Sequence, residues 1–333
     1  MKGLTNSDWS EFVDYQEFLL EIRRVQVSAT YVRQSKKSDS TELNNWIDVR
    51  VKRDDQLYYS AAHGACPHPE HRKHQAVPNR EQQTTDAIVA RLLSEGWQVS
   101  ELDAGDYYPR IWRGGKHFKN KTGEHYPLPY VDELPYLDSF VVALQQLEIL
   151  FEDLTGVFGN VHPDSSNRTS FGSRIRNLLI LASTEVECEW RAILEANGNT
   201  ADRFTTNDYH KLSPILRLDE YNLSLRRYPH YPELCPFGGW DRAQPTKSLP
   251  WYHAYNEVKH DREGAFEKAS LEHAVSAVGA CVILLAAQFG PHSLKRFELR
   301  NIFEFVSVPV WPITQWYIDP VVGGSWRRVN FPF

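Results

Sequence analysis

The feature that most constrains this chain is the apolar stretch at 266–289, which reads FEKASLEHAVSAVGACVILLAAQF. Alanine and glycine recur through it, and such small residues let neighbouring helices approach closely. Its later part is apolar all round, which predicts a helix buried at the centre of a bundle. The uninterrupted run at 277–289 has 13 residues, fewer than the roughly 20 that a membrane-spanning helix needs. We therefore expect a core helix and no membrane segment.

The composition is that of a soluble globular protein. The 333 residues are 41% hydrophobic and 24% charged, with a formal net charge of −6, so a disordered chain is excluded. The negative charge argues against binding nucleic acid over the whole surface, although a local basic patch stays open. The four cysteines form no CxxC pair, and no secretory segment follows Met1. These features favour a reducing, cytoplasmic location.

Residues 1–130 combine strand and helix patterns. Apolar and polar residues alternate in the segment 46–53, as they do in a strand with one solvated face. The segment 57–61 is its expected hairpin partner. The segment 84–96 has the period of an amphipathic helix and ends in Gly96. We therefore expect a mixed α and β region here.

Residues 131–290 are expected to be helical. Apolar residues recur at helical spacing in three stretches before the central helix, at 136–155, 171–197 and 251–263. An irregular insertion rich in Pro and Tyr occupies 199–250, and 216–225 within it alternates like a strand. A loop of this length often has a function or covers a site.

The segment 291–333 returns to alternating apolar and polar residues. We expect it to form a short β tail that packs on the N-terminal region. The predicted fold class is therefore α+β, in which a helical bundle lies between a mixed α/β region and a β tail.

A basic and aromatic stretch at 107–121 is one candidate nucleic-acid surface. Its cations can contact phosphates while its rings stack on bases. The residues are Arg110, Arg113, Lys116, Lys119 and Lys121, with Trp112 and Phe118 between them. A solvated hairpin with a Gly-Gly turn explains the same pattern, and it is the interpretation we favour.

The loop at 63–74 is a candidate metal site. Imidazole and thiolate are ligands that zinc prefers. The loop contains His63, Cys66, His68, His71 and His74. Their spacing matches no standard zinc finger, and structural zinc sites usually draw ligands from two separate segments. We therefore expect a polar surface loop, and we predict no metal or other cofactor.

The strongest candidate for chemistry is the polar helix at 251–263. Asn256 and His260 are four residues apart and share a face, which Lys259 and Arg262 flank. An imidazole can act as a general acid or base near neutral pH, and the cations can stabilise charge on a phosphodiester. No metal is needed if an RNA 2′-hydroxyl is the nucleophile. On spacing alone, however, these residues fit better as the polar edge of an amphipathic helix.

Three glutamates on the long helix at 171–197 are possible partners for this face. They are Glu185, Glu187 and Glu189. One that faces inward can orient His260 or pair with Lys259.

Here the chain resembles the HEPN superfamily, over residues 136–290. The pattern W-x3-YN-x2-KH-x-R carries the resemblance, together with LLILASTEVE at 178–187 and TTNDYHKL at 205–212. It is formed by Trp251, Tyr255, Asn256, Lys259, His260 and Arg262. The resemblance implies a compact helical bundle and a metal-independent ribonuclease of a toxin or phage-defence system. It also implies a homodimer with its site at the interface, and an antitoxin or other protein partner.

The chain departs from this family at one position. Active HEPN ribonucleases carry an arginine a few residues before the catalytic histidine, and no arginine stands there before His260. Either Lys259, Arg262 or Arg203 replaces that cation, or the domain binds without cleaving. Arg203 and His210 also fit the spacing between the arginine and the histidine in active HEPN ribonucleases.

The predicted catalytic residues are therefore His260, Lys259, Asn256 and Arg262. The predicted binding residues are Arg203, His210, Glu187 and Tyr255. The first hypothesis is an RNA-directed protein, in which His260 is the acid or base of a ribonuclease. The alternative is a non-catalytic module that binds RNA or protein.

Overall fold

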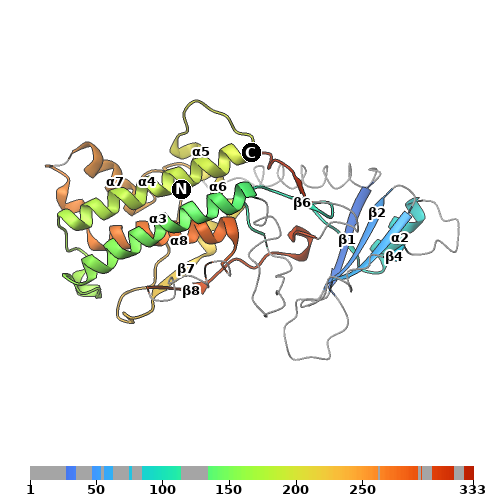
Figure 1. The fold of residues 1–333 in the computed structure, drawn as a ribbon, viewed down its shortest axis with the longest axis horizontal. Coiled ribbons are helices and arrows are strands. Elements are labelled where there is room, and N and C mark those ends of the chain that lie inside the picture. Colours follow the sequence, from blue (N-terminus) through green and yellow to red (C-terminus); the bar gives the residue numbers. More distant parts are fainter. Residues whose placement is uncertain are drawn as a thin grey trace, which may run out of the picture. The chain divides into compact units, whose positions relative to one another are not determined.

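Figure 1 shows a computed structural model of the chain. It describes residues 28–34, 47–53, 56–62, 75–76, 85–113, 134–261, 263–291, 294, 302–318 and 326–333. The loop at 63–74, Arg262 and the lysines of the basic stretch lie outside these residues, so the predictions that rest on them stay predictions. The described fold is mostly helical, with a few short strands.

The chain forms two compact units. One contains residues 1–107, 113–124 and 311–328, so it draws on both ends of the sequence. The other, called the helical unit below, contains 108–112, 125–310 and 329–333.

The first unit is built on an antiparallel sheet with the strand order β4-β3-β2-β1-β5. Its strands are β1 (Ser28–Gln34), β2 (Ile47–Arg53), β3 (Gln56–Ala62), β4 (Gln75–Ala76) and β5 (Gln98–Val99). The hairpin of β2 and β3 confirms the alternation prediction, with Ile47 opposite Ala62. The predicted amphipathic helix is also present, as α2 (Thr85–Ser94).

A shorter pairing joins distant parts of the sequence within this unit. Strand β6 (Asp106–Tyr107) lies parallel to β9 (Arg327–Arg328). The Arg327 guanidinium donates two hydrogen bonds of 2.8 Å to the Asp106 carboxylate. This bidentate pair fixes part of the C-terminal segment beside β6.

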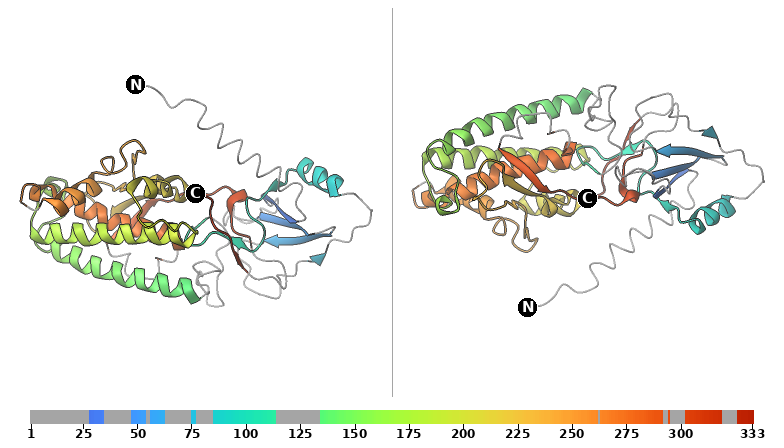
Figure 2. Two further views of the ribbon diagram at one scale, coloured as in Figure 1. Left: turned by 90° about the horizontal axis from the view of Figure 1, so that it is seen from above. Right: turned by 90° about the horizontal axis from the view of Figure 1, so that it is seen from below.

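The helical unit has a core of four helices, which Figure 2 shows with their long axes side by side. They are α3 (Leu134–Phe158), α4 (Ser173–Ala196), α7 (Pro250–His260) and α8 (Leu271–Phe289). Helix α8 packs against each of the other three, and every residue from Ala277 to Phe289 is buried. The predicted central helix is therefore confirmed.

Helix α8 begins later than the sequence pattern indicated. Residues Phe266–Lys268 form a short 3-10 turn, and α8 starts after Ser270. The Ser270 backbone is extended and its hydroxyl accepts a hydrogen bond from the His273 amide. This N-cap satisfies an amide that has no partner within the helix.

Among the described helices, α8 has the length and composition of a membrane span. It has 19 residues, so the estimate from the shorter run at 277–289 was too low. However, 83% of its apolar window is buried inside the protein. Packing against α3, α4 and α7 accounts for its apolarity.

The insertion contains less strand than predicted. It forms α5 (Thr206–His210), α6 (Leu212–Leu216), a 3-10 turn (Leu218–Glu220) and β7 (Asn222–Leu225). The strand prediction for 216–225 is therefore wrong in its first half. Arg217 is the cause, because it adopts a left-handed conformation with φ of 52° and ends α6.

The expected β tail is divided between the two units. Strand β8 (Phe303–Ser307) pairs antiparallel with β7 in the helical unit. In contrast, β9 pairs with β6 in the first unit. The β8 pairing also supplies the irregular insertion with backbone hydrogen bonds.

Aromatic packing holds the insertion on α4. The Trp190 ring is fully buried and stacks on Tyr209 and Trp240, each with ring centroids 5.0 Å away. Trp190 also contacts Trp251 and Tyr252 of α7 edge-on or at a tilt. Tyr209 and Trp240 of the insertion are thus part of the core of this unit.

The buried position of Leu284 in α8 gives a test of this core. Leu284→Ala leaves a cavity, because the side chain has no exposed surface, so the free energy of unfolding should fall by about 2–5 kcal/mol. Urea denaturation followed by circular dichroism measures it. Val142 of α3, which is 64% exposed, gives the control Val142→Ala with a change below about 0.5 kcal/mol. Equal effects of the two variants would contradict the assigned core.

Candidate functional site

Helix α7 presents one buried side and one polar side, as the sequence predicted. Trp251, Tyr255 and Val258 are buried. Lys259 and His260 are exposed in the last turn. The helix ends at His260, three residues earlier than expected, and the Asp261 carboxylate then accepts a hydrogen bond from the Gly264 amide. The last turn therefore carries two of the four predicted catalytic residues at the surface.

Asn256 is bonded inside its own helix. Its amide nitrogen donates a 2.8 Å hydrogen bond to the Tyr252 carbonyl, one turn earlier. One of the two N–H donors of the Asn256 side chain is therefore occupied by the helix backbone. This contact fits the amphipathic-edge interpretation of Asn256 better than the phosphate-orienting role.

A chain of hydrogen bonds links Glu187 of α4 to Lys259 of α7. The Tyr252 hydroxyl donates to the Glu187 carboxylate at 2.7 Å, and the Tyr255 hydroxyl lies 3.4 Å from its other oxygen. The Lys259 ammonium donates to the Tyr255 hydroxyl at 2.8 Å. The hydrogen bond with Tyr255 raises the pKa of Lys259, and the Glu187 charge adds to the effect. Lys259 is therefore charged at neutral pH.

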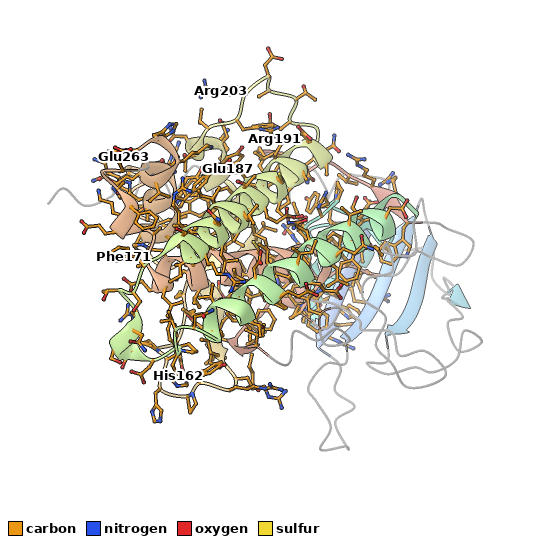
Figure 3. The ribbon with its side chains drawn as sticks, turned by 60° about the vertical axis from the view of Figure 1, so that its left-hand side comes forward. His162, Phe171, Glu187, Arg191, Arg203 and Glu263 are labelled. Carbon is orange, nitrogen blue, oxygen red and sulfur yellow. The ribbon has the colours of Figure 1, made fainter. Side chains whose placement is uncertain are left out.

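A second oriented cation lies on α4. Arg191 is exposed and follows Glu187 by four residues, so the two share a face. Figure 3 shows both on the same side of α4, with Arg203 beyond them in the insertion. Burial raises the pKa of Tyr209, and a hydrogen bond from Arg191 partly offsets this.

Arg176 completes a polar line between the two helices. Its guanidinium donates to the Val258 carbonyl of α7 at 3.3 Å. We name this line the α4–α7 seam. It consists of Arg176, Glu187 and Arg191 from α4 with Tyr252, Tyr255 and Lys259 from α7. Arg176, Arg191 and Tyr252 were not among the predicted site residues, although their helical spacing from Glu187 and Tyr255 is present in the sequence.

The remaining predicted binding residues lie in the insertion. Arg203 is exposed in the loop before α5. His210 is half-buried, and its Nε2 lies 3.3 Å from the Trp240 carbonyl while its ring meets the Trp240 ring edge-on. His210 therefore contributes to the packing of the insertion.

A separate polar cluster is buried in the helical unit. The Glu189 carboxylate accepts hydrogen bonds from Arg110 at 3.1 Å and from Gln288 of α8 at 2.6 Å. Arg110 also donates to the Gln288 side-chain oxygen at 2.7 Å. Arg110 adopts a left-handed backbone with φ of 56° to make these contacts. A carboxylate in this environment is stable only because its charge is paired and hydrogen-bonded.

The Gly-Gly turn and second arm of the predicted hairpin lie outside the described residues, so the hairpin stays a prediction, but Arg113 in its first arm is buried and not solvated. After β6 the backbone to residue 113 is irregular. Arg113 is buried and pairs with Glu101 at 2.6 Å within the first unit. Arg110 and Arg113 are thus both used in internal ion pairs.

The carboxyl group of Glu185 has an unusual proton affinity. Burial raises its pKa from 4.5 to about 7, and the negative charge of Glu189 and a hydrogen bond with that residue add to the shift. The positive charge of Arg110 opposes it. Burial and a neighbouring negative charge both disfavour the ionised form of a carboxyl group. Glu189 has the cationic partner, so Glu185 takes up the proton.

This shift predicts a pH-dependent stability that Glu185→Gln reduces. The folded state binds more protons than the unfolded state between pH 4.5 and about 7, so the stabilisation is complete below this window and lost as the pH rises through it. The variant should therefore gain stability relative to wild type over this window. Urea denaturation at several pH values measures the difference. Glu195→Gln, at an exposed position of α4, should show no such gain.

The seam predicts unequal effects of two tyrosine variants. Tyr255→Phe removes the hydroxyl that accepts from Lys259, so the Lys259 pKa should fall toward its ordinary value, and stability should fall by about 1–2 kcal/mol. Tyr252→Phe breaks a bond to Glu187 but leaves the Lys259 contact, and is the matched control. Titration of the lysine side chain by NMR measures the pKa. Equal shifts in both variants would contradict the assigned contact.

The described residues contain no group of three or more His, Cys, Asp or Glu side chains placed to hold a metal ion. Comparison of the chain with family models, curated proteins and solved structures gives no match. The function must therefore be argued from the chemistry of the seam.

Proposed function

We propose that the helical unit is a HEPN-like, RNA-directed module that binds the phosphate backbone of RNA along the α4–α7 seam. One observation carries the proposal. Lys259 is an exposed cation whose ammonium donates a hydrogen bond to the Tyr255 hydroxyl, and Arg191 is a second exposed cation, one turn after Glu187 on α4. A neutral hydroxyl orients a cation without cancelling its charge.

This arrangement suits a phosphate ligand. Contacts with phosphates supply most sequence-independent affinity for nucleic acids, and lysine and arginine are the residues that make them. The net charge of the chain, −6, does not oppose such a site, because a local field at the seam determines the contact. RNA as the nucleic acid follows from the resemblance of 136–290 to HEPN proteins, as do the homodimer and the role in a toxin or phage-defence system.

Metal-independent cleavage by His260 is the second candidate. It is favoured by the position of His260, which is exposed and directly follows Lys259. In this scheme His260 is the acid or base, and Lys259 stabilises the charge that develops on the phosphodiester. Glu187 is bonded to Tyr252 and Tyr255, so its role is to hold the tyrosines.

The binding proposal predicts that Lys259→Gln weakens RNA binding. The loss of one phosphate contact should lower the affinity several-fold at low salt and less at high salt, because counterion release is reduced. Fluorescence anisotropy with a labelled single-stranded RNA measures it. The control is Lys247→Gln, at an exposed lysine of the insertion. Wild-type protein that binds no RNA at low salt would contradict the proposed function.

Cleavage is tested separately with His260→Ala in the presence of EDTA. If His260 is the acid or base, the variant should cleave at least about 100-fold more slowly than wild type while retaining RNA binding. His253→Ala is the matched control, since His253 lies on the same helix, where its Nε2 is 3.7 Å from the Glu257 carboxylate. RNA binding without cleavage by wild type would favour the non-catalytic module.

A further inference from the structure

The outer face of α3 keeps apolar side chains in contact with water. Val142 is 64% exposed and Ile149 is 51% exposed. They are seven residues apart, which is about two helical turns, so their side chains leave the same side of the helix. Helix formation does not require them, because β-branched residues have low helix propensity. Neither the core nor the helix itself therefore accounts for these two residues.

Helix α4 adds an apolar residue to this face. Helices α3 and α4 pack side by side and are joined by the connection at 159–172 (Figure 1), so they run antiparallel. Near this connection the Arg174 side chain lies against Gly156. Seven residues farther from the connection, the same sides of the two helices carry Ile149 and Leu181. Leu181 is 46% exposed, so the apolar surface extends from α3 to α4.

The pattern repeats once more along the two helices. Another seven residues on, α3 carries Val142 and α4 carries Cys188, which is exposed. A free cysteine behaves as a small apolar residue. We name these residues the α3–α4 strip, which consists of Val142 and Ile149 from α3 with Leu181 and Cys188 from α4. Single exposed apolar residues are common, whereas a group of them with a polar rim is typical of an interaction site.

The α3 side of the strip carries negative charge that no described residue neutralises. Helix α3 contains no lysine, arginine or histidine between Leu134 and Phe158. Its four carboxylates are all exposed, and none forms an ion pair with a described residue. They are Asp138, Glu148, Glu152 and Asp153. Arg174 lies one repeat beyond the strip, and the four carboxylates outweigh it. The strip therefore attracts a ligand that is both apolar and cationic.

This charge distinguishes between the possible occupants of the strip. A second copy of the same surface would bring two acidic α3 helices into one interface, because a two-fold interface pairs a surface with itself. The N-terminal segment at 7–24 has five carboxylates and two arginines, so the strip repels it as well. A basic amphipathic helix fits, because its apolar residues at i, i+3 or i+4, and i+7 lie on one side and its cations flank them.

We propose that the α3–α4 strip is a docking surface for a basic amphipathic helix of a partner protein. The apolar side of that helix packs on Val142, Ile149 and Leu181, and its lysine or arginine side chains pair with the carboxylates of α3. The strip shares no residue with the α4–α7 seam. The inference therefore goes beyond the proposed RNA-directed function and does not rest on it.

A synthetic peptide tests this surface. The probe is a fluorescein-labelled peptide of about 18 residues with leucine and lysine at the spacing of an amphipathic helix, called the lysine peptide below. Its counterpart has glutamate in place of lysine. In fluorescence anisotropy with the full chain at low salt, the lysine peptide should bind and the glutamate peptide should not. The affinity should fall as added salt screens the charges.

Serine variants test the apolar contacts. Ile149→Ser and Leu181→Ser should each lower the affinity for the lysine peptide about ten-fold, because each removes an apolar anchor. Val306→Ser is the matched control, since Val306 is a half-exposed apolar residue of β8 outside the strip, and it should bind the peptide as wild type does. Circular dichroism checks that each variant is folded.

Charge variants separate this site from general attraction to an acidic protein. Glu148→Gln combined with Glu152→Gln should weaken binding several-fold and reduce its salt dependence. The matched control is Asp202→Asn combined with Glu233→Gln, which removes two exposed carboxylates of the insertion. Equal weakening by the two double variants would overturn the proposal.

The remaining outcomes are equally decisive. Wild-type protein that does not bind the lysine peptide overturns the docking surface. A wild-type dimer that Leu181→Ser converts to a monomer in analytical ultracentrifugation assigns the strip to a second copy and overturns the basic-helix partner. Ile149→Ser should leave RNA binding unchanged, so failure of this inference is distinct from failure of the proposed function.

Discussion

The burial of α8 is the constraint on which the helical unit depends. A helix that is apolar on all sides cannot expose any face to water without losing the main free-energy gain of folding. Helices α3, α4 and α7 cover it, and each must direct its own apolar side inward to do so. The polar sides of α4 and α7 are thereby left outward, where they meet along the seam. The candidate site is thus a consequence of how the core is closed.

Tyrosine is suited to the position it occupies in this seam. The rings of Tyr252 and Tyr255 are buried, yet their hydroxyls reach Glu187 and Lys259 at the surface. An amphipathic side chain can therefore serve the core and the site at once. Because the rings are fixed by packing, the cation that they hold is fixed as well. This coupling makes the position of the Lys259 ammonium depend on the α4–α7 packing.

The buried cluster of Glu189, Arg110 and Gln288 shows how ion pairs replace solvation inside the same unit. Its residues come from three distant parts of the sequence, and Arg110 takes a left-handed backbone to reach the others. Removing a partner would leave a charge in a medium of low dielectric constant, which costs far more than an exposed charge. Burial, and next the adjacent Glu189 carboxylate of this cluster, raise the pKa of Glu185, since both disfavour its ionised form.

Local pattern was sufficient to predict the central helix, the hairpin of β2 and β3, and the exposed Lys259 and His260, because periodicity reports which face of an element meets water. Tertiary structure decided the rest. It placed β8 beside β7, ended α6 at Arg217, and brought Arg176 and Glu187 against α7. Pairing between distant segments depends on which surfaces remain uncovered after the core forms. No single stretch of residues contains that information, so the predicted polar edge of one helix became a seam only when α4 packed against it.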